Sequence, residues 1–127
     1  MLQPGELTVE VRSAGRTHRV LLRGELDIAT VGQVRGALLS LYRRGNRVTL
    51  DLDGLDFMDG IGVSLVLGAS RSADRDGWSL YVTQGSPAAR CALEATGVAS
   101  LLPSPPDTPP DRSGRFSRAA AGRAAVR

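Results

Sequence analysis

Four aspartates stand close together in the middle of the chain, and carboxylates at such short spacing could bind a metal ion or act as acid and base. They are Asp51, Asp53, Asp56 and Asp59. The first two alternate outward on a predicted strand, the third lies in a predicted corner, and the last precedes a predicted helix. Because the set is spread over several elements, solvated strand, turn and cap carboxylates are favoured over a metal site. We therefore predict no metal.

The other residue types that carry chemistry occur singly. His18 is the only histidine and Cys91 the only cysteine. A zinc site needs several Cys or His ligands, and a lone cysteine cannot form an internal disulfide. We expect Cys91 to be a small buried side chain on a helix. With no glycine-rich phosphate loop and no nucleophile beside a base, the sequence predicts a protein that is not an enzyme and needs no cofactor.

The composition limits the possible partners and location. The chain has 127 residues, 42% of them hydrophobic, and a net charge of +3. Arginines and acids balance over residues 1–102, so the positive charge comes from residues 103–127. A neutral body argues against nucleic-acid binding. No apolar run approaches the ~18 residues of a membrane span, and residues 1–15 lack the features of a signal peptide. We predict a cytoplasmic protein without membrane insertion.

The first half of the chain contains two strand patterns and one helix pattern. Apolar and polar residues alternate over 7–11, as in a half-buried strand. Residues 19–23 form a second predicted strand that ends at Gly24, and 13–16 form a turn between the two, so an antiparallel pair is predicted. Asp27 or Thr30 can cap the helix that follows. Its apolar stripe runs from Val31 to Leu41 at helical spacing, and its last turn contains Arg43 and Arg44, with Gly45 as its end.

The second half repeats a strand–helix alternation. A strand over 48–52 leads through a corner at 54–58 into a helix over 60–75, whose inward face is predicted to hold Val63, Val66, Leu67 and Ser70. A strand over 78–82 follows. Ser86 and Pro87 begin a last helix that ends at Gly97, and Val98, Leu101 and Leu102 form a final apolar cluster. The order β-β-α-β-α-β-α predicts an α/β fold with a mixed sheet of about four to five strands covered by helices.

The C-terminal part differs in composition from the rest. Residues 103–110 are mostly proline, which favours an extended segment. Residues 112–127 are rich in Arg and Ala and are predicted to be disordered, although Phe116, Ala120 and Ala124 could line one face of a short helix. We therefore predict one domain over 1–102 and a tail over 103–127.

Two segments of the sequence resemble those of a known family. Gly24-Glu-Leu-Asp-Ile-Ala-Thr30, together with Val48-Thr-Leu-Asp-Leu-Asp-Gly-Leu-Asp-Phe-Met-Asp59 and then Gly62-Val63, resembles the STAS domain of bacterial anti-sigma factor antagonists. The resemblance covers about residues 5–102. It implies a STAS-like fold and a partner-switching function: the protein binds an ATP-binding anti-sigma factor, often a serine kinase, and so releases the sigma factor. The kinase ends binding by phosphorylating a serine at the start of the second helix.

This sequence departs from the family at that serine. Aligned on Asp59 and Gly62, the two serines of the family's Asp-Ser-Ser-Gly segment fall on Gly60 and Ile61, which have no hydroxyl. Ile61 either contacts a partner, which would bury apolar area worth ~1.5–3 kcal/mol, or packs inward. Ser64 is either a displaced phosphoacceptor or, as we favour, a small interfacial or helix-packing residue. The resemblance implies these partner-binding residues: Asp27, Thr30, Asp59, Gly60, Ile61, Gly62 and Ser64.

Two other functions fit the same sequence. STAS-like domains also serve as scaffold or sensor subunits of larger signalling assemblies and of lipid-transport complexes. A weaker alternative is a nucleotide or other small anion at the start of the helix over 60–75, since helix N-termini attract anions. Asp59 would oppose a phosphate there. We rank the antagonist first, and the sequence predicts no particular oligomeric state.

Overall fold

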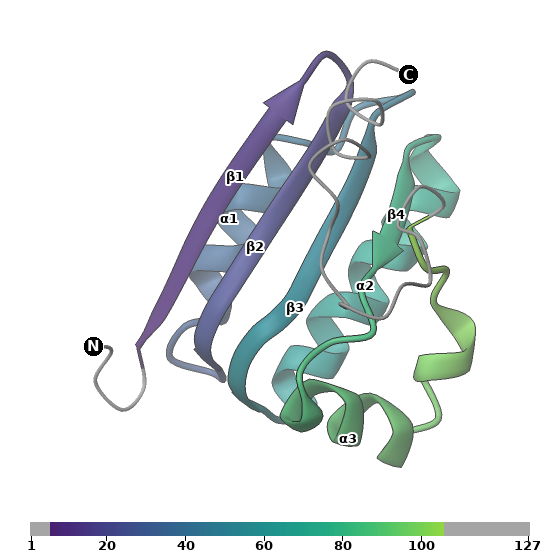
Figure 1. Cartoon of the computed structure of the whole chain (residues 1–127). Helices are drawn as coiled ribbons and strands as arrows, with labels where there is room; N and C mark the ends of the chain where they lie inside the picture. Colours follow the sequence, from purple (N-terminus) through teal and green to yellow (C-terminus); the bar gives the residue numbers. More distant parts are fainter. Residues whose placement is uncertain (1–5, 106–127) are drawn as a thin grey trace.

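A computed structural model describes residues 6–105 (Figure 1). The sheet is four-stranded in the order β1-β2-β3-β4, with β1 antiparallel to β2 and the other neighbours parallel. The predicted α/β class, mixed sheet and element order are confirmed. The elements are β1 Leu7–Ala14, β2 Thr17–Leu26, α1 Val31–Leu39, β3 Arg47–Met58, α2 Gly60–Asp76, β4 Ser79–Val82, α3 Pro87–Ala95 and the short 3-10 helix η1 Ala99–Leu101.

The core lies between the sheet and the two crossover helices. Figure 1 shows α1 and α2 behind the sheet, as expected when each helix connects neighbouring parallel strands. The alternating residues of β2 and β3 that face them are almost fully buried, and each large one contributes about 1.5–3 kcal/mol of burial free energy. They include Val20, Leu22, Val48, Leu50 and Leu52.

Both central strands are longer than the sequence pattern predicts. Gly24 does not end β2, which continues to Leu26, and the predicted corner at 54–58 is part of β3. Two irregularities in the β2–β3 register, between Leu21 and Arg23 and between Gly24 and Glu25, let the strands bend while they stay paired. A side chain at Gly54 would meet the Leu22 carbonyl at 2.9 Å, so glycine allows this close approach.

Helix α1 is shorter than predicted. It ends at Leu39, so Arg43 and Arg44 lie outside it, although Leu41 is buried as the apolar stripe implied. Residues 40–46 instead turn back toward β3. The buried Asn46 stabilises this turn because its side-chain amide donates to the Leu41 carbonyl over 3.0 Å. The apolar spacing therefore continues past Leu39, where α1 ends.

Helix α2 has the predicted length but a different inward face. Val63 and Val66 are buried, whereas Leu67 and Ser70 are only half-buried. The face is completed by small residues that the pattern did not indicate: Gly62, Ala69, Ser72 and Ala73, together with Leu65. Gly77 ends the helix in the left-handed conformation, with φ of 81°.

The last elements confirm one cap and correct two burial predictions. The Ser86 hydroxyl accepts from the Ala89 amide over 3.1 Å, and Pro87 begins α3. Cys91 is exposed, because it lies on the solvent side of this short helix. Leu101 is also exposed, so only Val98 of the predicted terminal cluster is fully buried, while Leu102 is half-buried.

The chain after η1 returns to the sheet. The Pro103 carbonyl accepts from the Val82 amide over 2.9 Å, and Pro105 is buried. The rest of the predicted tail, including the possible helix around Phe116, lies outside the described residues. Within residues 6–105, no helix has both the length and the apolar character needed to cross a membrane.

Candidate functional site

The sheet register brings the two motif segments together. Leu26 at the end of β2 pairs with Met58 at the end of β3. Parallel strands end at the same edge of a sheet, so the loop that begins at Asp27 lies beside the turn that begins at Asp59. We call this edge the carboxyl-end surface and define it by its part-exposed and exposed residues: Asp27, Ile28, Phe57, Asp59, Gly60, Ile61 and Ser64.

The loop before α1 is stabilised by its own polar side chains. An Asp27 carboxylate oxygen accepts from the amides of Ala29 and Thr30, over 2.9 and 3.2 Å. The Thr30 hydroxyl donates to the Glu25 carbonyl over 2.7 Å and accepts from the Asp27 amide over 3.0 Å. Thr30 is 2% exposed and makes no side-chain cap bond to α1. Its hydroxyl therefore positions the loop and is not part of the exposed surface.

The start of α2 is capped as predicted. One Asp59 carboxylate oxygen accepts from the amides of Ile61 and Gly62, over 3.0 and 3.3 Å. Gly62 is buried, and a side chain there would lie 3.0 Å from Leu26 and from Met58. Gly60 has open space around it and is exposed. The two glycines thus differ: Gly62 allows the helix to approach the strand ends, whereas no packing requires Gly60.

Apolar side chains are exposed around these caps. Ile61 is 39% exposed, which answers the question that the sequence left open in favour of a side chain that reaches solvent. Ser64 is exposed one turn further along α2, on the same helix face as Ile61. Ile28 and Phe57, at 76% and 44% exposed, were not singled out from the sequence. Their signal was available: each is a large apolar residue beside an aspartate of the motif.

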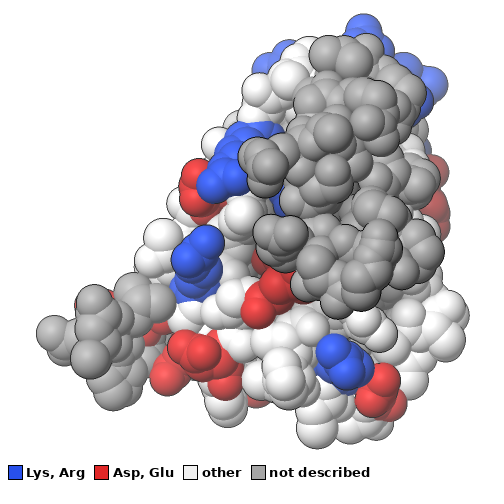
Figure 2. Space-filling view, viewed as in Figure 1, with Lys and Arg blue, Asp and Glu red and all other residues white. Residues whose placement is uncertain are grey.

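Acidic side chains accompany this apolar group. Figure 2 shows acidic residues at the lower end of the view, where β2 and β3 end. The segments that meet there contribute Glu25, Asp27, Asp56 and Asp59. An apolar centre with acidic neighbours favours a protein partner that presents an apolar contact with basic residues around it.

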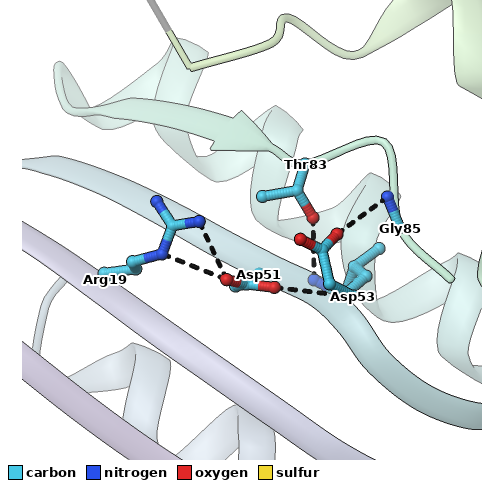
Figure 3. Close-up of polar contacts among 6 residues, drawn as sticks. Arg19, Asp51, Asp53, Thr83 and Gly85 are labelled. Carbon is cyan, nitrogen blue, oxygen red and sulfur yellow. Dashed lines mark hydrogen bonds and ion pairs between the residues drawn. The ribbon is translucent and has the colours of Figure 1, made fainter. Parts of the chain in front are cut away.

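A second group of polar residues lies on the sheet face that α1 and α2 do not cover (Figure 3). Arg19 donates twice to one Asp51 carboxylate oxygen, over 3.1 and 2.8 Å, and both residues are buried. The other Asp51 oxygen accepts from the Asp53 amide over 2.9 Å. The prediction that Asp51 points outward into solvent is wrong, because its carboxylate contacts a buried arginine that lies diagonally across on β2. We call Arg19, Asp51, Asp53 and Thr83 the polar face.

Asp53 continues this polar face toward α3. Its carboxylate accepts from the Gly85 amide over 3.1 Å, and the Thr83 hydroxyl accepts from the Leu52 amide over 2.9 Å. Loss of solvation, followed by repulsion from Asp51, raises the pKa of Asp53 above its ordinary value. The Asp51 carboxylate thus binds Arg19, and the Asp59 carboxylate binds the backbone amides at the start of α2. Within residues 6–105, no group of three or more His, Cys, Asp or Glu side chains could hold a metal ion.

Comparison with known proteins identifies the family. The family model described as "Mlab, STAS domain" matches residues 9–103. The chain belongs to the STAS domain family. An anti-sigma-B factor antagonist of Staphylococcus aureus is 26% identical over 97 residues, which cover 76% of this STAS chain and 90% of the relative. An anti-sigma F factor antagonist of Lysinibacillus sphaericus is 33% identical over 81 residues, which cover 62% of this chain and 69% of that protein.

Solved structures of anti-sigma factor antagonists share this fold. An anti-sigma factor antagonist from Mycobacterium paratuberculosis superimposes with a TM-score of 0.69 at 19% identity, over 84% of this chain and 91% of that one. The antagonist SpoIIAA in its unphosphorylated form gives a TM-score of 0.64 at 26% identity, over 77% and 88% of the two chains. Bacillus SpoIIAA has also been solved in its phosphorylated form. The resemblance inferred from the motifs is confirmed.

Proposed function

We propose that this STAS domain is an anti-sigma factor antagonist that binds an ATP-binding anti-sigma factor of the serine-kinase type through its carboxyl-end surface. The supporting observation is the pairing of Leu26 with Met58, which places the Asp27 and Asp59 segments side by side. The curated relatives are anti-sigma factor antagonists, which supports the same role. The partner follows from the family resemblance and from the exposed apolar centre with acidic neighbours.

We propose further that the usual phosphoserine switch is missing. Gly60 and Ile61 stand where the family has serines, and neither has an oxygen that a kinase could phosphorylate. SpoIIAA exists in both an unphosphorylated and a phosphorylated form. In this chain the same helix start presents an aliphatic side chain that is 39% exposed. Binding is therefore regulated by the amounts of the two proteins and not by phosphate at this position.

The mechanism follows from how the surface is stabilised. Asp27 and Asp59 use carboxylate oxygens to fix the two backbone turns, so the surface is ordered before a partner arrives and little conformational entropy is lost on binding. Ile28, Phe57 and Ile61 then supply the apolar area that becomes buried. The antagonist competes with the sigma factor for the anti-sigma factor, and the sigma factor is released by mass action.

Calorimetry with a kinase-type anti-sigma factor from the same genome tests the role. We expect the parent chain to bind with a single saturable isotherm. Ile61→Asp places a charge in the contact and should weaken binding by about 2 kcal/mol or more. Leu101→Asp is the matched control, because Leu101 is 66% exposed but lies on η1, outside this surface. Absence of binding to every such anti-sigma factor, or equal losses in both variants, would contradict the proposal.

A second candidate is a scaffold or sensor subunit of a larger complex. The matching family model carries the description "Mlab, STAS domain" and not that of an antagonist, which favours this alternative. The same apolar surface would then contact a permanent neighbour. Affinity purification of the chain from its own host separates the two candidates: a stable multi-subunit complex without an anti-sigma factor would support the subunit role.

A further inference from the structure

The outer edge of β1 is an eight-residue strand edge with no strand beside it in the described part of the chain. Figure 1 shows β1 at the side of the sheet opposite β4. The Glu6 carbonyl accepts from the Glu25 amide over 2.9 Å, which fixes the phase of the β1–β2 ladder. Antiparallel ladders alternate, so the backbone groups of Leu7, Val9, Val11 and Ser13 point away from β2, toward this edge.

The side chains in the middle of this strand, over residues 10–13, are exposed. Val11 lies on the helix side of the sheet, opposite the fully buried Val20 of β2, yet it is 44% exposed. On the other side of the strand, Glu10 and Arg12 form an exposed ion pair of 2.8 Å. Charged residues on an edge strand usually hinder pairing with another strand. In one register, however, the spacing of Glu10 and Arg12 favours pairing with a second copy of the strand.

We propose that a second copy of this chain pairs antiparallel with β1 about a two-fold axis at Val11. In this register each Val11 faces the Val11 of the other copy, and each Glu10 faces an Arg12. The Glu10–Arg12 pairs fall at positions without backbone hydrogen bonds, where opposing side chains lie closest. About six backbone hydrogen bonds join the copies. The two sheets then form one continuous sheet of eight strands.

The charge pattern makes this register self-complementary. Both members of the exposed ion pair gain an opposite charge from the partner strand, and the exposed Val11 becomes covered. A register centred on Val9 would place Glu10 opposite Thr8 and leave it without a cation across the interface. The contact is small compared with stable interfaces, so self-association is weak and concentration-dependent.

Sedimentation of the full chain at increasing concentration, up to about 1 mM, measures this dimer. We expect Arg12→Glu and Glu10→Arg each to weaken self-association by about tenfold or more, because like charges then face each other across the axis. An equimolar mixture of the two variants should recover association, since both facing pairs then join opposite charges again. This recovery would not occur if either substitution merely unfolded the strand. High salt should weaken the parent dimer.

The outcomes are distinct. A parent chain that stays monomeric at the highest concentration overturns the proposal. A dimer that neither substitution weakens uses another surface and also overturns it. A dimer that Arg12→Glu weakens and Glu10→Arg leaves intact overturns the Val11 register. Recovery in the mixture, after loss in both single variants, supports the register and the edge together.

Discussion

The carboxyl-end surface and the polar face both contain aspartates from a short stretch of sequence, yet the surroundings of these carboxylates differ. Asp59 accepts from two backbone amides and leaves Ile61 exposed beside it. Asp51 accepts from Arg19, and both side chains are buried. Asp59 thus shapes a surface that another molecule can contact, whereas Asp51 stabilises the sheet itself.

Removal of Asp51 should have the largest effect on stability. Asp51→Ala leaves Arg19 without the carboxylate that it contacts, and breaking a buried ion pair typically costs about 3–5 kcal/mol. The free energy of unfolding in urea measures this loss. Arg75→Ala is the matched control, since it breaks an exposed ion pair with Asp76 and should cost less than about 1 kcal/mol. Equal losses in the two variants would mean that the polar face does not stabilise the sheet.

Alanine substitutions at the two glycines near the start of α2, Gly60 and Gly62, should change stability in opposite directions. Gly62→Ala introduces a methyl group 3.0 Å from Leu26 and Met58, and we expect it to cost about 1–3 kcal/mol. Gly60→Ala meets no neighbour within 4 Å and should stabilise the chain by about 0.4–1 kcal/mol, since alanine loses less backbone entropy than glycine. Urea unfolding of both variants provides the measurement. A tolerated Gly62→Ala would show that the helix start is not packed tightly on the strand ends.

Substitution of Asp53, which lies at the end of the polar face toward α3, should have the smallest effect on stability. The pKa of Asp53 is raised in the folded chain. Ionised Asp53 therefore destabilises the fold at pH values above this pKa, and the destabilisation disappears as the pH falls toward the pKa of the unfolded chain. Asp53→Asn keeps an acceptor for the Gly85 amide and removes the charge. We expect a slight gain in unfolding free energy at pH 7, within about 0.5 kcal/mol. Thermal unfolding at pH 7 and pH 3 should show this gain at pH 7 only.

The sequence predicted the order of the elements because strand alternation, helix spacing and caps are local signals. Asp59, Ser86 and Gly77 have the roles that their types and positions indicate. The path of β3 through residues 54–58 depends on contacts with distant residues, such as the approach of Gly54 to Leu22. No local pattern contains these contacts. The sequence therefore predicts less about boundaries than about element types.

The candidate site could be predicted in part for the same reason. The motif segments located Asp27, Asp59 and the missing serines, since these belong to short contiguous stretches. Burial of Asp51 could not be read from alternation, because it depends on which residues of β2 lie beside it, and burial of Thr30 depends on how its loop folds. Ile28 and Phe57 stand beside motif aspartates, but their type alone does not show exposure, because exposed and core apolar residues look alike in sequence. The register of β2 against β3 shows which residues of the two motif segments lie side by side, and the motifs alone do not show this.

The absence of the switch at Ile61 is the central claim, and one phosphorylation measurement tests it directly. The parent chain and Ile61→Ser are each incubated with the kinase-type anti-sigma factor, Mg²⁺ and ATP, and their intact masses and binding are followed. We predict that the parent chain gains no phosphate and stays bound, whereas Ile61→Ser gains one phosphate beside Asp59 and dissociates, because the added charge of about −1.5 to −2 repels the acidic surface. A phosphate on Ser64 of the parent chain, with loss of binding, would contradict the account.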